Sequence, residues 1–381
     1  MRQLRPSPIL AECATPAKYA SGVLSSKTKD LEPDALRRSV EGARRFMMGS
    51  INPTGLWSDF LTLAGESVYW VTGYVGYALA RFEGARDEEE VRLLSRAASR
   101  LLGGQGEDGG WGYGPGVPSD ADSTSWCLLF LSRLGAQGAA SRERAVRFLL
   151  RHQSQADGGF RTYAAPREVG RFMMLDASVS FEGWSSSQTC VTPVAADALL
   201  EAGFNEGVDR ALDYIRRGQD AAGYWEPYWW SERLYATAGC MELLRTKGTP
   251  EDSERVRRAE EWIVRSQLPS GAWSESPTTP GVPFSTALAL RGLGPDPRLP
   301  EAIERGVGWL LTEQLSDGSW NPHHILRVPH PSTMEPWKQS VWKQDGRAIG
   351  AVIKDHRRLF TTATGFVALS RLAEGHPRRE P

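Results

Sequence analysis

The sequence predicts an all-α protein: a single double-walled (α/α)6 barrel, or toroid, built from six helix-pair repeats. Three observations lead to this fold. A short glycine–aromatic turn returns six times along the 381 residues. Most copies lie between an amphipathic segment and a more apolar one, the pattern of an outer and an inner helix. No run of alternating β-branched residues persists, so no strand is predicted.

The repeated turn has the form Gln-x-x-Asp-Gly-x-Trp, with the Asp position variable. It occupies residues 105–111, 219–225, 267–273 and 314–320, with a variant one residue longer at 153–160 and a degenerate first copy ending at Trp57. The six aromatic positions are separated by 54, 49, 65, 48 and 47 residues. Glycine at the centre ends one helix and permits a positive-φ turn into the next.

The segments around the turns predict the two walls of the barrel. Charged amphipathic helices are expected before the turns, at 89–102, 142–152, 208–216 and 253–266. Apolar helices with few charges are expected after them, at 67–82, 123–134, 189–202, 232–245, 285–293 and 361–373. Because the second set is apolar on most sides, it should form the inner wall.

Six helix pairs can close into a ring or stack into an open solenoid. A solenoid needs polar capping repeats at its ends, and neither end of this chain shows an obvious one. We therefore expect a closed barrel over residues 34–373, with an N-terminal extension at 1–33 and a tail at 374–381.

Composition excludes several classes of function. Lys plus Arg number 45 and Asp plus Glu 46, which gives no long-range attraction for nucleic acid. The four cysteines form no CxxC pair, which favours reduced thiols over a zinc ribbon. The N-terminus has no signal-peptide pattern, and the longest strongly apolar stretch, 67–80, is too short to span a membrane. We expect a cytoplasmic chain without a transmembrane segment; its oligomeric state stays open.

The repeated turn resembles the QW motif of squalene–hopene cyclases, oxidosqualene cyclases, plant diterpene cyclases and protein prenyltransferase β subunits. The resemblance covers residues 34 to 373, and its motif is more specific for the fold than for the reaction. In that family the Gln and the aromatic ring are structural. The resemblance therefore assigns to stability, and not to catalysis, Gln105, Trp111, Gln267, Trp273, Gln314 and Trp320.

A second motif lies where the second inner helix begins. Asp120, Asp122 and Ser123 resemble the DxDD motif of class II terpene cyclases, and the match is closer to the DxDTT variant of drimane-type cyclases, because a serine stands where DxDD has its last Asp. The resemblance implies that Asp122 is the proton donor, Asp120 its carboxylate partner and Ser123 a hydrogen-bonding support. Only this one of the six repeats carries the motif.

Protonating an isolated alkene requires a strong acid that stays undissociated. A dry cavity and a neighbouring carboxylate both raise the pKa of an Asp, whereas the positive end of a helix lowers it. Burial would have to prevail. The same residues ahead of an apolar helix also make a good N-cap, so capping is the alternative reading.

Carbocations formed after protonation would need an aromatic, water-poor wall. The residues expected to bind substrate near the inner-helix starts are Trp70, Trp126, Trp184, Tyr228, Trp229, Trp230, Glu232 and Phe360. Two links are longer than the rest, 161–186 and 321–358, and we expect both to form lids over one mouth. The second is rich in basic residues, including Arg327, Arg347 and Arg358, which suggests an anionic group such as a diphosphate; a solvated loop is the alternative.

The expected function is therefore that of a class II terpene cyclase acting on a linear isoprenoid or isoprenoid diphosphate. The expected partner is a small apolar or amphiphilic substrate. We expect no cofactor, with Mg²⁺ entering only alongside a diphosphate. The zinc chemistry of prenyltransferases is disfavoured, since no Asp-x-Cys segment pairs with a suitable downstream His. Two alternatives stay open: a binding protein that kept the toroid, and an enzyme that uses Asp122 and Glu232 across the mouth as an acid–base pair.

Overall fold

The computed structural model of the chain describes residues 33–82, 84–136, 138–275, 281–344 and 346–374. Most of the predicted N-terminal extension, most of the predicted tail, and Cys13 lie outside this part of the chain. The other three cysteines, Cys127, Cys190 and Cys240, are buried free thiols. Within the described residues, no helix is long and apolar enough to cross a bilayer.

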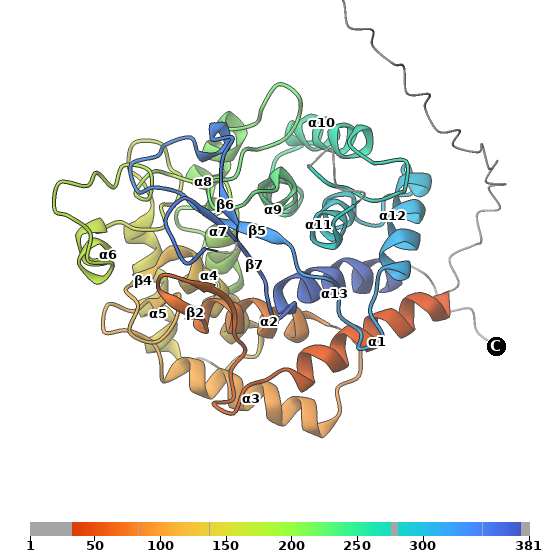
Figure 1. Cartoon of the computed structure of the whole chain (residues 1–381), viewed down its shortest axis with the longest axis horizontal. Helices are drawn as coiled ribbons and strands as arrows, with labels where there is room; N and C mark the ends of the chain where they lie inside the picture. The colour runs from red at the N-terminus through yellow and green to blue at the C-terminus, as the bar shows by residue number, and fades with distance from the viewer. Residues whose placement is uncertain (1–32, 83, 137, 276–280, 345, 375–381) are drawn as a thin grey trace, which may run out of the picture.

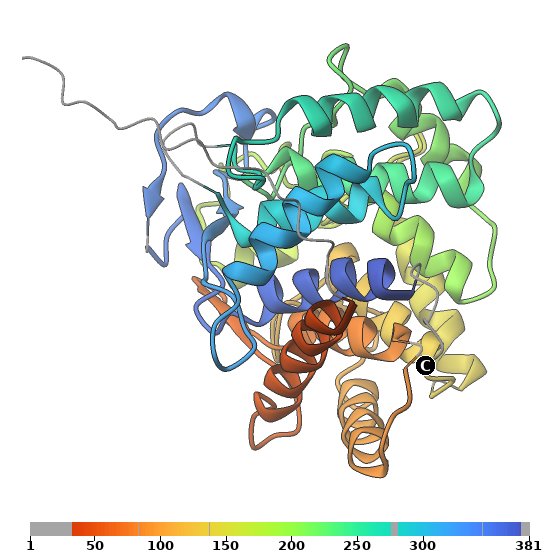
Figure 2. The same ribbon diagram turned by 90° about the vertical axis from the view of Figure 1, so that its right-hand side faces the viewer.

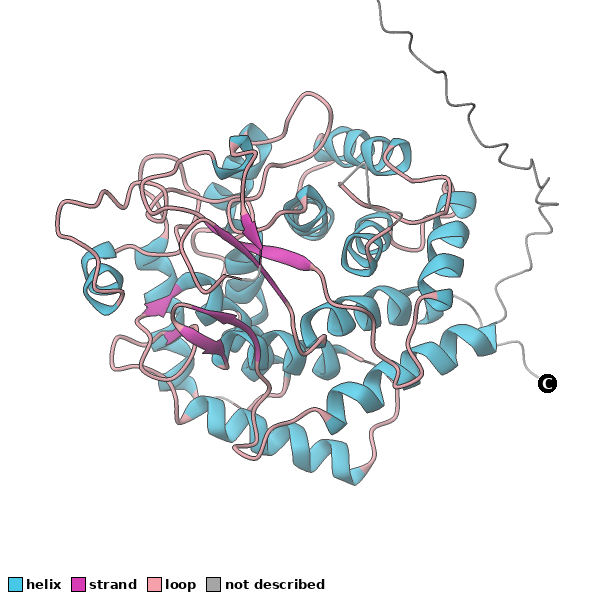
Figure 3. Cartoon of the chain, in the orientation of Figure 1, coloured by secondary structure: helices cyan, strands magenta, loops and turns pink. Residues whose placement is uncertain are grey.

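Twelve of the described helices form two concentric rings (Figures 1 and 3). The inner ring consists of α2 (Tyr69–Arg81), α4 (Ala121–Arg133), α7 (Thr192–Glu201), α9 (Arg233–Lys247), α11 (Pro283–Leu293) and α13 (Leu359–Glu374). The outer ring consists of α1 (Pro33–Gly49), α3 (Glu88–Leu102), α5 (Ala139–His152), α8 (Val208–Arg217), α10 (Asp252–Arg265) and α12 (Pro300–Thr312). The predicted inner helices agree with the observed ones to within three residues at each end.

The inner ring is closed. Each inner helix contacts the next in the order α2, α4, α7, α9, α11, α13, and α13 returns to α2. Outer helix α1 contacts both α13 and the last outer helix, α12. These contacts confirm the (α/α)6 barrel and exclude the open solenoid.

The turns join neighbouring repeats by a repeated set of hydrogen bonds. The Gln105 side chain donates to Gly109 O (2.8 Å) in its own turn and to Ser141 O (3.0 Å) at the next outer helix. Gln314 does the same at the closure, where it donates to Ser39 O of α1 (2.9 Å). The structural role implied for these glutamines agrees with this geometry.

The aromatic residue of each turn is held in an equally regular way. Trp111 Nε1 donates to Leu101 O (2.7 Å) of the preceding outer helix, and Trp111 N donates to Thr124 Oγ1 (2.9 Å) of the following inner helix. Trp225 and Trp273 repeat both bonds. The threonine partners were not predicted, because the turn motif itself does not contain them.

The prediction that the chain has no strands was wrong. In the part of the chain that the structure describes, short strands form three small sheets: β1 (Asp59–Thr62) with β2 (Gly65–Ser67), β3 (Trp111–Gly112) with β4 (Ser119–Asp120), and β5 (His324–Val328) with β7 (Ala351–Lys354) and β6 (Lys343–Gln344). β5 and β7 are antiparallel, and β6 and β7 are parallel. All lie in links between an outer and an inner helix, at one end of the barrel (Figure 2). Two to five residues are too few to display an alternating pattern.

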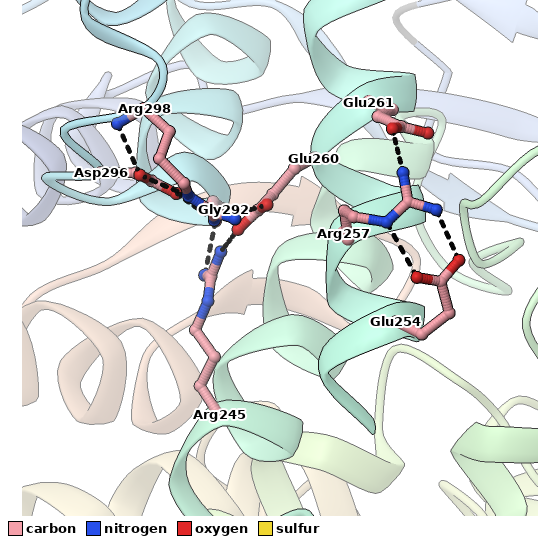
Figure 4. A network of polar contacts seen from close by, with 8 residues as sticks. All are labelled: Arg245, Glu254, Arg257, Glu260, Glu261, Gly292, Asp296 and Arg298. Carbon is pink, nitrogen blue, oxygen red and sulfur yellow. Dashed lines mark hydrogen bonds and ion pairs between the residues drawn. The ribbon is translucent and has the colours of Figure 1, made fainter. Parts of the chain in front are cut away.

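Polar contacts connect the helices at the end of the barrel where the inner helices finish. Glu260 of α10 accepts from Arg245 of α9 (2.8 Å) and from Arg298 (2.9 Å), which follows α11 (Figure 4). Arg257 pairs with two glutamates on its own exposed helix face, and such pairs contribute little to stability. The chemistry-bearing residues lie at the other end, where the inner helices begin.

Candidate active site

A cavity opens at the barrel end that carries the strands. Its walls come from the β1–β2 turn, the start of α4, the short helix α6 (Pro166–Phe172) of the first insertion, and β5 of the second. Most of its surface is carbon. The residues lining it are Thr62, Leu63, Ala64, Trp70, Tyr113, Val117, Asp120, Asp122, Ser123, Thr162, Tyr163, Val169, Phe172, Met173, Trp184, Trp229, Leu326, Arg327 and Val328.

Asp120 is the N-cap of α4. Its Oδ1 accepts from Ser123 N (2.7 Å), and its Oδ2 accepts from Ser123 Oγ (2.7 Å). Pairing of β4 with β3 sets its backbone opposite Trp111. Burial raises the pKa of the Asp120 carboxyl to about 7, against the opposing effect of these hydrogen bonds. The capping alternative therefore describes Asp120.

Asp122 lies in the first turn of α4 and has a different environment. Its Oδ1 is buried without a hydrogen-bond partner among the described residues. The side chain still has accessible surface, because it faces the cavity. Burial, and then the negative charge of Asp120, raise the pKa of Asp122 well above its usual range. Burial is the largest of these effects, so the pKa of Asp122 stays high although the residue lies in the first turn of a helix.

Two indole N–H groups point at this carboxyl. Contact with the N–H groups of Trp70 and Trp126 lowers the pKa of Asp122, against the larger effect of burial, yet neither Nε1 forms a hydrogen bond to any described residue. Two buried donors therefore lie beside the acid without a hydrogen bond. Ser123 supports Asp120 and forms no hydrogen bond to Asp122 among the described contacts.

A small polar network holds the first insertion against the acid. Trp229 Nε1 donates to Thr162 Oγ1 (2.7 Å) and Gln188 Oε1 (2.8 Å), and Thr162 Oγ1 donates to Gln188 (2.6 Å). The Thr162 carbonyl accepts from Ala121 N (3.0 Å) at the start of α4. Sequence reasoning missed this network, because threonine and glutamine carry no motif here.

The comparisons with known proteins identify the family. Residues 195–334 match the family model of the squalene–hopene cyclase C-terminal domain. The structure of type II terpene cyclase MstE from Scytonema, without ligand, superposes with a TM-score of 0.80 at 32% identity, over 90% of this chain and 99% of that one. The chain belongs to the type II terpene cyclase family. A structure of an MstE variant contains geranylgeranyl dihydroxybenzoate as substrate, with a TM-score of 0.80 at 31% identity over 90% and 98% of the two chains.

The curated relatives match a smaller share of this terpene cyclase chain than the MstE structures do. Terpentedienyl-diphosphate synthase of Kitasatospora griseola is 26% identical over 193 residues, which is 48% of this chain and 33% of the relative. Drimenyl diphosphate synthase of Streptomyces showdoensis is 30% identical over 200 residues, which is 50% and 34% of the two chains. The chain thus spans about a third of the length of the curated relatives it matches.

The aromatic residues predicted from the sequence divide into two groups in this terpene cyclase chain. Trp70, Trp184 and Trp229 line the cavity. Trp230 and Phe360 do not line the cavity; their ring centroids lie 5.9 and 5.0 Å from that of Trp70, in an aromatic cluster that includes Phe60 and Phe284.

Trp126 and Tyr228 also stand outside the lining of this cavity. The Trp126 ring borders a second, smaller cavity together with Asp197, Tyr235 and Arg291, while its N–H faces Asp122. Tyr228 Oη donates to Thr333 O (2.8 Å), which fastens the second insertion to the loop before α9.

Both insertions contact each other near the cyclase's acid motif. Trp184 Nε1 donates to Pro329 O (3.1 Å), and Gly183 N donates to Pro331 O (2.8 Å). Tyr163, two residues after the first insertion begins, lines the cavity, and burial and the charges of Asp120 and Asp122 raise its pKa well above the usual range. Sequence reasoning missed Tyr163, although an aromatic residue just beyond a turn motif, as at Tyr113, was an available signal.

The basic residues of the second insertion do not gather at the cavity. Arg358 donates to Ser319 Oγ (2.8 Å), pairs with Asp317 (3.0 Å) and covers the Phe46 ring, because it turns back to the last glycine–aromatic turn. Arg347 is exposed and does not line the cavity. Arg327 lines it.

Glu232 precedes α9 and is buried behind the cavity wall. Its Oε2 accepts from Ser285 Oγ (2.6 Å), and burial raises its pKa while the charge of Arg327 lowers it. It does not line the cavity with Asp122, so the two carboxyls do not face each other there. Among the described residues, no cluster of three or more His, Cys, Asp or Glu side chains could hold a metal ion.

Proposed function

We propose that this chain is a class II terpene cyclase in which Asp122 protonates the terminal double bond of a linear isoprenoid. The observation that supports it is a buried carboxyl with a raised pKa and one unpartnered oxygen, at the wall of an apolar cavity. An acid of this kind can pass its proton to a double bond that is bound in the cavity.

The proposed reaction conserves atoms and charge. The Asp122 O–H proton forms a new C–H bond at the terminal double bond and leaves a tertiary carbocation. The π electrons of the following double bonds form the ring C–C bonds. The last carbocation releases a proton to water, and Asp122 takes one back from water. Substrate and product are therefore isomers.

The surroundings of Asp122 favour the forward step. When the carboxylate forms, the N–H groups of Trp70 and Trp126 and the N-terminus of α4 can stabilise it. These donors are already in place, so little reorganisation is needed at the moment of transfer. Asp120, fixed by Ser123, keeps the proton on Asp122 until the substrate is bound.

The walls suit a carbocation. Trp70, Trp184 and Trp229 present aromatic surface to the cavity, and cation–π contact stabilises positive charge without reacting with it. The two insertions limit access of water, which would quench a carbocation. Proton-initiated cyclisation needs no metal ion, and Mg²⁺ would enter only with a diphosphate substrate.

The polyprenyl part of the substrate and its polar head group are supported by different comparisons. A structure of an MstE variant contains geranylgeranyl dihydroxybenzoate as substrate, whereas the two curated relatives are named as diphosphate synthases. A polyprenyl chain is common to both, and we propose it for this chain. A binding protein without activity is the alternative that an assay separates.

Incubation in D₂O with a panel of isoprenoids tests the proposal. Geranylgeranyl dihydroxybenzoate, geranylgeranyl diphosphate, farnesyl diphosphate and squalene are each supplied, and products are analysed by mass spectrometry. We expect at least one cyclised product that carries a single deuterium on carbon, because Asp122 exchanges its proton with solvent before transfer. Cyclised product without deuterium would contradict protonation, and no turnover of any compound would favour the binding protein.

A further inference from the structure

Arg327 occupies a special place in the cavity. It lies on β5, whose pairing with β7 sets it opposite Val352, and its backbone N donates to Trp229 O (2.6 Å). The chain around it is therefore fixed to the loop that carries a cavity-lining tryptophan. Its side chain lines the same cavity as Asp122.

The Arg327 guanidinium has donors to spare. It donates to Pro227 O at 3.4 Å and to Ser231 O at 3.3 Å, both longer than typical N–H···O hydrogen bonds. It lies 5.7 Å from the Trp342 ring centroid. A guanidinium carries five N–H donors, and no carboxylate of the described chain lies within ion-pair distance of it.

Three glutamate side chains act electrostatically on the Arg327 guanidinium. Burial lowers its pKa, and the negative charges of Glu275, Glu226 and Glu232 raise it again. Glu275 accepts from the backbone of Arg233 and Leu234 and is itself held by the side chain of Arg233. Burial thus disfavours the charged form of Arg327, and Glu275, whose own pKa burial raises to about 8, offsets this only in part.

The rest of the cavity adds no further cation. Among the lining residues that the structure describes, Arg327 is the one Lys or Arg side chain, and the other charged candidates are Asp120 and Asp122. A diphosphate carries several negative charges and is held in proteins by groups of cations or by metal ions. Placed here, it would meet one cation only among the described lining residues.

We propose that Arg327 binds the polar head of the substrate, and that this head is a neutral or singly charged oxygen group, such as a hydroxyl, phenol or carboxylate, rather than a diphosphate. The inference rests on the proposed cyclase function, since it orients a polyprenyl chain with its terminal double bond at Asp122 and its head at Arg327. Arg327 is then a positioning residue for a reaction that begins at the opposite end of the chain.

Binding measurements separate this inference from the cyclase activity. Asp122→Asn protein, in which proton transfer is disabled, is titrated with three geranylgeranyl compounds that carry a dihydroxybenzoate, a hydroxyl or a diphosphate head. We expect the dihydroxybenzoate to bind at least about tenfold more tightly than the diphosphate. Adding Arg327→Gln should weaken binding of the dihydroxybenzoate about 10- to 100-fold, the value of a hydrogen bond to a charged group.

Two further variants make the result specific. Arg327→Lys keeps the charge but loses the planar fork, and should give a loss between those of the Arg and Gln proteins. Arg147→Gln removes an exposed arginine from outer helix α5 and should leave every Kd unchanged. Circular dichroism checks that each variant is folded. If Arg327→Gln does not fold, the comparison of Arg327→Lys with the parent protein tests the proposal.

The outcomes are distinct. Tightest binding by the diphosphate, or an unchanged Kd for the dihydroxybenzoate in the Arg327 variants, would overturn the head-group proposal whether or not the protein is a cyclase. The expected binding pattern together with no turnover by the wild-type protein would support the subsite and contradict the cyclase activity.

Discussion

At the scale of single residues, two aspartates two positions apart have different tasks because their surroundings differ. Asp120 satisfies the first turn of α4 and is itself satisfied by Ser123. Asp122 has an oxygen with no partner and faces an apolar cavity. The sequence suggested that acid and cap were competing readings of one motif, whereas in the structure Asp120 makes the capping bond and Asp122 makes none.

The negative charge of Asp120 should govern the pH range of activity. It raises the pKa of Asp122, so the Asp120→Asn variant, which keeps a capping side chain, should lower that pKa. Activity requires protonated Asp122 and is lost as pH rises through its pKa. We therefore expect the alkaline limb of the kcat–pH profile to move to lower pH. A limb that stays in place or moves to higher pH would contradict the electrostatic coupling.

The sequence could predict the site residues that belong to a recognisable motif or to an aromatic segment near an inner helix, but not the others. Asp120, Asp122, Trp70, Trp184 and Trp229 were all named from the sequence and all line the cavity. The roles of these residues stay predictions. Thr162, Tyr163 and Gln188 could not be chosen from sequence, because their importance comes from contacts between distant segments.

At the scale of elements, helices could be predicted and the strands could not. The inner helices are apolar over ten or more residues, a length at which periodicity is visible. The main strand pair of the second insertion joins β5 and β7, which are separated in sequence by more than twenty residues. Pairing of that kind leaves no local pattern in the sequence.

The glycine–aromatic turn is an element whose stability can be tested with two glycines. Gly318 has φ +89°, and a Cβ there would collide with Gly42 O of α1, at the ring closure. Gly318→Ala should therefore lower the free energy of unfolding by at least about 1–3 kcal/mol.

Gly308 provides the matched control. It lies inside α12, and a Cβ there would meet nothing within 4 Å. Gly308→Ala should raise the free energy of unfolding by about 0.5–1 kcal/mol, because alanine loses less backbone entropy. Urea unfolding measures the free energy of unfolding of both variants. Equal changes for the two substitutions would show that the positive φ and the close contact at Gly318 do not constrain the turn.

At the scale of the whole molecule, the ring places the proposed acid and the arginine proposed to bind the head group in one cavity. Closure of α13 onto α2 brings the second insertion, which precedes α13, beside the start of α4. Asp122 and Arg327 are 205 residues apart in sequence and line the same space. The six-fold repeat predicted the ring, but not which side chains from the long links would reach the cavity.

The central claim is that Asp122 donates the proton, and the most direct measurement is the turnover of Asp122→Asn. An amide cannot deliver the proton, so we expect a folded protein whose kcat falls by at least about 10²–10⁴-fold, the usual worth of a general acid. Asn should not disturb α4, because Asp122 makes no capping bond for it to replace. A folded Asp122→Asn protein that cyclises its substrate at the wild-type rate would contradict the account.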